Sequence, residues 1–300
     1  MILSRSILPA IIIVFIVSSA FSQGATDLYL FRLKKTDDQA YHLYHAEFLS
    51  SFNRGGYTNQ PWFTREGNLL VSARKAGEKQ NDIYQLSPIT KSIRRITKTP
   101  SNEYSPRIHP DGQQLTVLRQ VEGDSINQQV YKVSLKGGRY ISMTPEIRNI
   151  GYYTCMASNH LALFRIMGES NTLEYMNLDD RRTRRIASTV GRTLWTDPAG
   201  NVVYVHKFAT EYWYLKKYNP VTATIEIIAE TPGLTEDFAV APDGSFFMSV
   251  GSKVYSLQPS KEKTWRVVMD LSIYGIKEIT RMAISPDGTQ LALVSSKENG

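Results

Sequence analysis

The sequence predicts an all-β protein, a six-bladed β-propeller whose ring is closed by N-terminal strands that complete the last blade. Three observations predict this fold: a turn motif that occurs six times, four short strands in each repeat, and a last repeat that stops half-way. Units of four strands repeated every 41 to 47 residues are typical of propeller blades. No stretch with helical periodicity is long enough to compete with this interpretation.

The turn motif sets the repeat. Gly and Asn best tolerate the positive φ that a tight hairpin requires, and each motif has one of them at its pivot. The pivots are Gly67, Gly112, Asn159, Gly200, Gly244 and Gly288. Asp111, Asp243 and Asp287 precede three of these pivots. A carboxylate there bonds to nearby backbone amides, so we interpret these residues as turn formers rather than as catalytic groups.

Short strands rich in Val, Ile, Leu and Tyr follow each turn. The first strand after the turn is apolar, as in residues 69–73 and 291–296. The second is centred on a Tyr in five repeats, as in residues 82–87, and a third follows, as in residues 93–97. Many of these strands are apolar on both faces, which favours packing between two neighbouring sheets.

The last repeat contains two strands, residues 279–285 and 289–296, and then ends. Residues 26–33 have the same apolar-Tyr-apolar form as the second strand of other repeats, and residues 41–49 fill the place of the outermost strand. We therefore expect the sixth blade to be built from both ends of the chain. Such closure hides strand edges that would otherwise pair with other molecules.

The N-terminus reads as an export signal. Residues 1–22 contain one basic residue, an apolar core and small residues before a cleavage site, which is typical of a secretory signal peptide; an uncleaved anchor is the alternative. Residues 23–300 then form a single propeller domain. We expect a periplasmic protein, with secretion as the alternative. Cys155 is the one cysteine, so the domain has no internal disulfide and depends on its core.

The chain carries a net charge of +7, spread over many segments. The densest basic stretch, residues 179–186, is interpreted as a solvated hairpin face, with binding to a polyanionic surface as the alternative. An exported protein does not normally meet nucleic acid, so no nucleic-acid partner is predicted. We expect a monomer.

Residues 81–119 resemble the WD40-like (PD40) repeat of the TolB family. The resemblance lies in an Ile-Tyr strand at Ile83, an Ile-Thr pair at Ile96 and a Pro-Asp-Gly turn at Pro110, and residues 284–296 are a second close match. It implies a mostly periplasmic family of propellers, in which TolB binds envelope proteins through one mouth of the ring. The chain departs from TolB because it has no room for the α/β domain that precedes the propeller there. It also has no length for a peptidase domain after the propeller.

The mouth of a propeller is built largely by loops that enter the blades, and ligands usually bind there. We expect these loops to contain the partner-binding residues, because Tyr and Arg are frequent anchors of interfaces. The candidates are Tyr57, Asn59, Glu103, Tyr104, Tyr152, Arg192, Glu236, Asp237 and Arg281.

The sequence therefore predicts a non-catalytic propeller that binds a protein or peptide of the cell envelope at its mouth, with no cofactor and no metal. One alternative is a metal-dependent lactonase or lyase, for which Asn59, Glu103 and Asp237 would have to converge. The other is a glycan-binding propeller, in which exposed aromatic residues such as Trp195, Trp213 or Tyr212 stack on sugar rings. No nucleophile–base motif or phosphate loop is recognisable.

Overall fold

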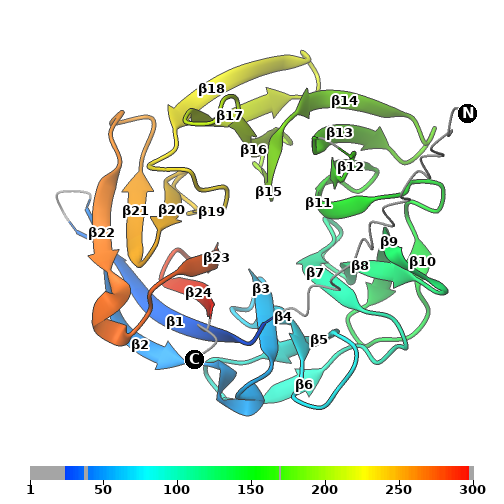
Figure 1. The fold of residues 1–300 in the computed structure, drawn as a ribbon, viewed down its shortest axis with the longest axis horizontal. Helices are drawn as coiled ribbons and strands as arrows, with labels where there is room; N and C mark the ends of the chain where they lie inside the picture. Colours follow the sequence, from blue (N-terminus) through cyan, green and yellow to red (C-terminus); the bar gives the residue numbers. More distant parts are fainter. Residues whose placement is uncertain (1–23, 37–39, 169, 297–300) are drawn as a thin grey trace, which may run out of the picture.

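Six four-stranded antiparallel sheets are arranged in a ring in the computed structural model of the chain (Figure 1). The structure describes residues 24–36, 40–168 and 170–296, without the side chains of residues 125 and 126. The predicted all-β, six-bladed β-propeller is confirmed. The predicted signal peptide, residues 1–22, lies outside the described residues.

In every blade the strand nearest the ring axis is the first of its repeat, and the order then runs outward. The first three blades in chain order are β3 (Tyr57–Phe63), β4 (Leu69–Arg74), β5 (Asp82–Leu86) and β6 (Ile93–Arg95); β7 (Glu103–Ile108), β8 (Gln114–Val121), β9 (Asp124–Ser134) and β10 (Ile141–Ser142); and β11 (Ile150–Ala157), β12 (His160–Arg165), β13 (Thr172–Asn177) and β14 (Thr183–Ser188). The next two are β15 (Val190–Thr196), β16 (Val202–Lys207), β17 (Trp213–Asn219) and β18 (Thr224–Glu230); and β19 (Phe238–Val240), β20 (Phe246–Val250), β21 (Lys253–Leu257) and β22 (Arg266–Asp270).

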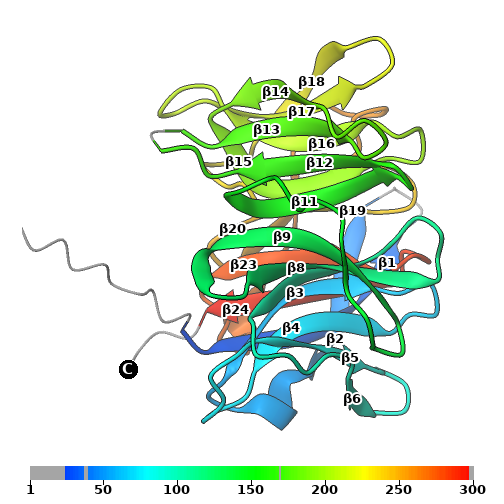
Figure 2. The ribbon, with the colours of Figure 1, turned by 90° about the vertical axis from the view of Figure 1, so that its right-hand side faces the viewer.

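The last blade joins both ends of the chain, as predicted. Its order from the axis outward is β23 (Ile279–Ile284), β24 (Gln290–Ser296), β1 (Thr26–Lys35) and β2 (Tyr41–Phe48). Leu28 is paired with Val294, Tyr29 with Leu293 and Phe31 with Leu291. Figure 2 shows β1 beside β24 in the side view, where the blue and red ends of the colour scale meet.

The predicted turn chemistry is confirmed in five blades. All five pivot glycines have positive φ, between 71° and 82°. In the turn at Asp111 the carboxylate accepts a hydrogen bond from the Gln113 amide at 2.8 Å, and Asp243 and Asp287 bind backbone amides in the same way. Asn159 is the exception, because its φ is not positive. Its blade turns in two residues between Ala157 and His160, and neither of them has a positive φ.

The core lies between the blades. Each of the six clusters of buried apolar residues combines side chains from two neighbouring sheets, so that every blade is covered on both faces. Leu28 and Ala292 of the closing blade, for example, pack with Val71 and Tyr84 of the blade that follows. This explains why the middle strands are apolar at nearly every position and why the ring must close to bury its last face.

Outside the core, the basic stretch is solvated as predicted: residues 181–185 are exposed in the turn between β13 and β14 and at the start of β14. Two short 3-10 helices, η1 (Ser50–Asn53) and η2 (Leu271–Tyr274), connect strands. Within the described ranges, no helix has the length and apolar character needed to span a membrane.

Candidate binding site in the central channel

Five of the six inner strands are bulged. The pairing of β3, β7, β11, β15 and β23 with the next strand shifts register within the strand. At two of these bulges Gln60 and Ser105 take left-handed backbone conformations, with φ of 56° and 49°. The Ser105 amide donates to Gln60 Oε1 at 2.7 Å, which links the two bulges. Bulges turn side chains away from the regular alternation, and here they direct polar residues towards the axis.

A polar ring results from this geometry. In each blade the residue seven positions before the turn pivot lines one cavity of about 310 Å³ on the ring axis. These six residues are Gln60, Ser105, Tyr152, Thr193, Asp237 and Arg281. We call them the polar ring.

Asp237 is the centre of the polar ring. It is 5% exposed and accepts hydrogen bonds from Thr193 Oγ1 at 2.7 Å and from Arg281 Nη1 at 2.9 and 3.0 Å. Arg192 donates to the same carboxylate through Nη2 at 2.5 Å. Arg281 Nη2 also donates to the Tyr152 hydroxyl at 3.0 Å. Both carboxylate oxygens of Asp237 are therefore engaged by charged or hydroxyl donors.

The charges in this network fix its protonation. Burial raises the pKa of Asp237, but Arg281 and Arg192 outweigh that effect, so the pKa is lowered from its usual value. The pKa of Arg192 is raised, because the carboxylates of Asp237 and Glu236 outweigh its own desolvation. Asp237 is thus a permanent anion at neutral pH.

A second ion pair supports the first. Glu236 accepts from Lys207 Nζ at 2.7 Å and lies 3.3 Å from Arg192 Nε. Its Oε2 also accepts from the Arg192 amide at 3.2 Å. Gly191 makes this approach feasible, since a Cβ there would lie 2.8 Å from the Glu236 Cβ. The Arg192 guanidinium is held between two carboxylates.

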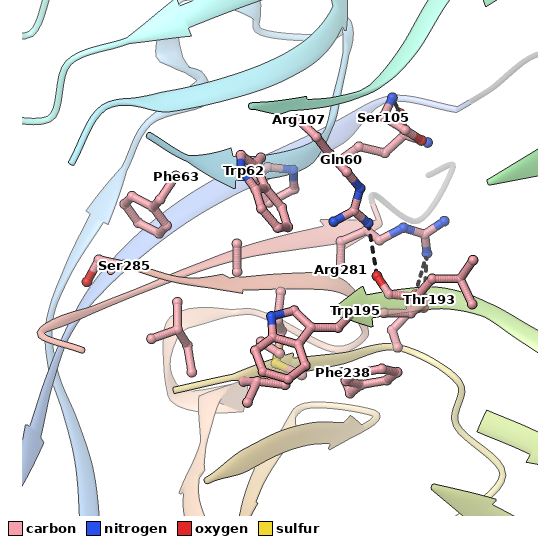
Figure 3. Close-up of a pocket in the computed structure, with 18 of the residues that line it drawn as sticks. Gln60, Trp62, Phe63, Ser105, Arg107, Thr193, Trp195, Phe238, Arg281 and Ser285 are labelled. Atoms are coloured by element: carbon pink, nitrogen blue, oxygen red, sulfur yellow. Dashed lines mark hydrogen bonds and ion pairs between the residues drawn. The ribbon is translucent and has the colours of Figure 1, made fainter. Parts of the chain in front are cut away.

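A second layer lies two residues further along each inner strand. Five of its six members also line the cavity: Trp62, Arg107, Trp195, Ala239 and Ala283. Arg107 reaches across the axis, and its Nη2 donates to the Leu194 carbonyl at 3.1 Å (Figure 3). Its guanidinium carbon lies 4.4 Å from the centroid of the Trp62 ring. Figure 3 shows Trp62 and Trp195 on opposite sides of the cavity.

The cavity has two chemically different ends. The polar ring and Arg107 form one end. From there the cavity runs towards the turns that end the inner strands, where Ala241, Pro242, Ile284 and Pro286 line it. The lining contains three guanidinium groups and one carboxylate, all on described residues. The site therefore offers aromatic faces, an apolar end and an excess of positive charge.

The predicted loop origin of the site is wrong for most candidates. Tyr57, Asn59, Glu103, Tyr104, Tyr152, Arg192 and Arg281 lie within inner strands, and Glu236 and Asp237 directly precede β19. The strands begin earlier than the sequence pattern indicates, because residues on both sides of each bulge pair with the next strand. Four of the nine candidates, Tyr152, Arg192, Asp237 and Arg281, line the cavity.

The other candidates serve different contacts. Tyr57 is 6% exposed, and burial raises its pKa. Asn59 Oδ1 accepts from the Gln60 amide at 2.7 Å, and Tyr104 packs against the apolar cluster between two blades. Glu103 is fully buried and accepts from Thr99 Oγ1 at 3.0 Å; burial raises its pKa. The structure does not bring these four residues, or Glu236, to the cavity lining.

The residues required by the two alternative functions, a metal-dependent enzyme and a glycan-binding propeller, do not come together in the cavity. Asn59, Glu103 and Asp237, the set required for a metal-dependent enzyme, have separate partners, and no group of three or more His, Cys, Asp or Glu side chains suited to a metal ion occurs within residues 24–36, 40–168 and 170–296. Trp195 lines the cavity, whereas Trp213 packs between blades under Lys207 and Tyr212 is 51% exposed elsewhere.

Sequence reasoning missed Gln60, Trp62, Arg107 and Thr193, because it looked for the site in loops. Their spacing was available as a signal: they stand five or seven residues before the turn pivots, where other blades place Asp237, Arg281 and Trp195.

No known sequence family matches the chain, and no curated protein does. Solved structures are similar to it. A putative TolB from Agrobacterium tumefaciens has a TM-score of 0.65 at 13% identity, with 92% of this chain and 99% of that chain covered. TolB from Acinetobacter baumannii has a TM-score of 0.56 at 16% identity. The alignment covers 91% of this chain but 64% of that chain, so this chain spans less than two thirds of its length.

An oligogalacturonate lyase in complex with manganese is also similar, with a TM-score of 0.56 at 13% identity over 86% of this chain and 83% of that chain. Propellers with different activities thus share this architecture, and at such identities the likeness speaks for the fold alone. The chain has a six-bladed β-propeller fold similar to that of these TolB structures.

Proposed function

We propose that the chain is a periplasmic propeller that binds a protein or peptide partner of the cell envelope in its central channel, without chemistry. The observation that carries this proposal is the state of Asp237. A general base needs an accessible lone pair and a pKa near the working pH. Asp237 has both oxygens engaged and a lowered pKa, so it orders the channel instead of accepting a proton.

The remaining lining fits recognition. Arg and Trp side chains are enriched among the residues that dominate binding energy in interfaces, especially in pockets that exclude water. Trp62, Trp195 and Arg107 supply this combination around the axis. The apolar N-terminal run supports export, and the TolB resemblance supports a periplasmic location.

A capture experiment tests the proposal. The purified protein, immobilised through its C-terminus, is incubated with envelope extract, and a retained protein is identified and purified. We expect it to bind the wild-type chain directly and to lose affinity for Arg281→Gln, because that substitution removes one of the two guanidinium groups that order Asp237.

Arg182→Gln is the matched control, since Arg182 is 87% exposed on the outer hairpin. Equal loss in both variants, or no retained protein, would contradict the proposal. The enzyme alternative is tested in parallel by metal analysis and by incubation with oligogalacturonate and manganese. A stoichiometric divalent ion or turnover of the sugar would overturn a purely binding role.

A further inference from the structure

Arg107 is the guanidinium of the cavity lining that has no counter-ion among the described residues. Arg192 and Arg281 share Asp237, and Arg192 also contacts Glu236. Within the described part of the chain, no carboxylate forms an ion pair with Arg107, whose hydrogen-bond partner is a neutral carbonyl, Leu194. Of the three guanidinium groups that line the cavity, Arg107 is therefore the one that forms no ion pair with a described residue.

Two donors of Arg107 are also unused. Its Nε and Nη1 are buried and have no hydrogen-bond partner among the described residues. Buried donors are nearly always paired in native proteins, and an exception requires an explanation. A guanidinium binds the two oxygens of a carboxylate through Nη2 together with either Nε or Nη1, so an unused donor of Arg107 can form such a pair once Nη2 leaves the Leu194 carbonyl. A bound carboxylate would supply an acceptor oxygen for an unused donor and the negative charge that Arg107 lacks.

The rest of the cavity indicates what is attached to that carboxylate. In the same layer as Arg107 the cavity is lined by the Trp62 and Trp195 rings and by Ala239 and Ala283, and Pro242 lines it nearer the turns. A ligand that places its anion at Arg107 therefore places an apolar group beside the indoles. At about 310 Å³ the cavity is at the small end of the range for ligand sites, roughly 300–1,000 Å³.

We propose that the cavity receives the carboxyl terminus of the partner polypeptide, with the terminal carboxylate on Arg107 and an apolar last side chain between the indoles. This inference rests on the proposed function and names the part of the partner that enters the channel. A chain end fits so small a space because one backbone enters it, whereas an internal segment needs room for the backbone to enter and to leave. The terminus enters from the turn end, carboxylate first.

Binding requires a movement of Arg107. Its Nε and Nη1 are covered while the guanidinium lies over Trp62, so the guanidinium turns away from the indole and into the cavity when the carboxylate arrives. The emission of Trp62 reports this movement, because a cation 4.4 Å from the ring leaves it. Trp62→Phe identifies the signal among the four tryptophans of the chain.

The test compares two matched pools of random heptapeptides, one with free carboxyl termini and one with amidated termini. We expect the immobilised wild-type protein to retain peptides from the free-acid pool, with apolar last residues. For a retained peptide, fluorescence anisotropy is expected to show at least about tenfold weaker binding after amidation, which removes a charge-assisted bidentate contact. Arg107→Met is expected to cause a similar loss.

The two changes combined decide the assignment. If the carboxylate binds Arg107, amidation weakens binding to Arg107→Met no further. Additive losses would place the carboxylate elsewhere and overturn the proposal, as would equal retention of both pools. Octanoate, an apolar carboxylate without a peptide backbone, is tested in parallel. If the protein retained octanoate but no peptide, the carboxylate would not come from a polypeptide and the proposal would be overturned. Arg182→Met is the control and is expected to bind as the wild type. The amidation comparison uses the wild-type protein, so it decides even if Arg107→Met does not fold.

Failure of this inference is distinguishable from failure of the proposed function. An envelope protein could bind Arg281→Gln more weakly than the wild type but bind Arg107→Met as tightly as the wild type. This result would support the channel as the binding site and would refute the carboxyl terminus as the group that enters it.

Discussion

Replacing Asp237 with Asn tests whether the polar ring is a buried, unsolvated network. Asp237 is 5% exposed and receives donors from Thr193, Arg192 and Arg281. Removing one partner of a buried ion pair costs about 3–5 kcal/mol, because the remaining charge is left uncompensated. Arg192 is one-third exposed, so water compensates part of its charge and the lower end, about 3 kcal/mol, is expected.

The assay is reversible thermal or urea unfolding of wild type and Asp237→Asn. For a domain of this size, about 3 kcal/mol corresponds to a melting temperature lower by roughly 5 °C. The folded pKa of Asp237 lies below its usual 3.8, so its contribution is fully present above that pH and is lost as the pH falls through the folded pKa. The difference between the two proteins should therefore persist from pH 7 to pH 5 and shrink below pH 3.8.

A loss below about 1 kcal/mol at pH 7 would refute this reasoning, because it is the value expected of a solvated surface pair. A difference that grows at low pH would refute the sign of the pKa shift. Asp180→Asn, in the exposed basic hairpin, is the matched control and is expected to change stability by no more than a few tenths of a kcal/mol.

Three further outcomes are expected. Deletion of residues 26–49 removes two strands of the closing blade and exposes the edge of β24, so the product should aggregate in size-exclusion chromatography; a stable monomer would contradict the closure. Gly56→Ala should destabilise by about 1–3 kcal/mol in urea unfolding, since a Cβ there would collide with the Asn53 side chain and lie 2.6 Å from the Arg74 carbonyl, and wild-type stability would refute this. Burial raises the pKa of Cys155 to about 11, so iodoacetamide should react with it at pH 8 about two orders of magnitude more slowly than with the same thiol in guanidinium; equal rates would show an open site.

The fold was predictable because its signals are local. Gly67, Gly112, Gly200, Gly244 and Gly288 mark the turns through a backbone requirement that few residues meet. The ring closure was predictable from the number of strands in each repeat, since the last repeat lacked two strands and residues 26–49 had the matching pattern. Asn159 was misread for the same reason: its residue type permits a left-handed turn, but a two-residue connection there does not use one.

The site was less predictable because bulges decide which side chains reach the axis. Residue type identified Asp237 and Arg281 as candidates, but regular alternation does not reveal that Gln60 and Thr193 point the same way. Arg107 follows a proline within a strand, and nothing in its neighbours along the chain signals that its charge is left without a partner. That property arises from the six blades together.

The most direct test of binding in the channel is to fill it. Ala283 lines the cavity and stands at the position that Trp62 and Trp195 occupy in other blades, so an indole there is expected to fill part of the cavity. The measurement is the affinity of the captured envelope protein for wild type and Ala283→Trp by isothermal titration calorimetry, with circular dichroism as the check of folding. We predict at least a tenfold loss, about 1.4 kcal/mol. Equal affinity of a folded Ala283→Trp protein would contradict binding in the channel.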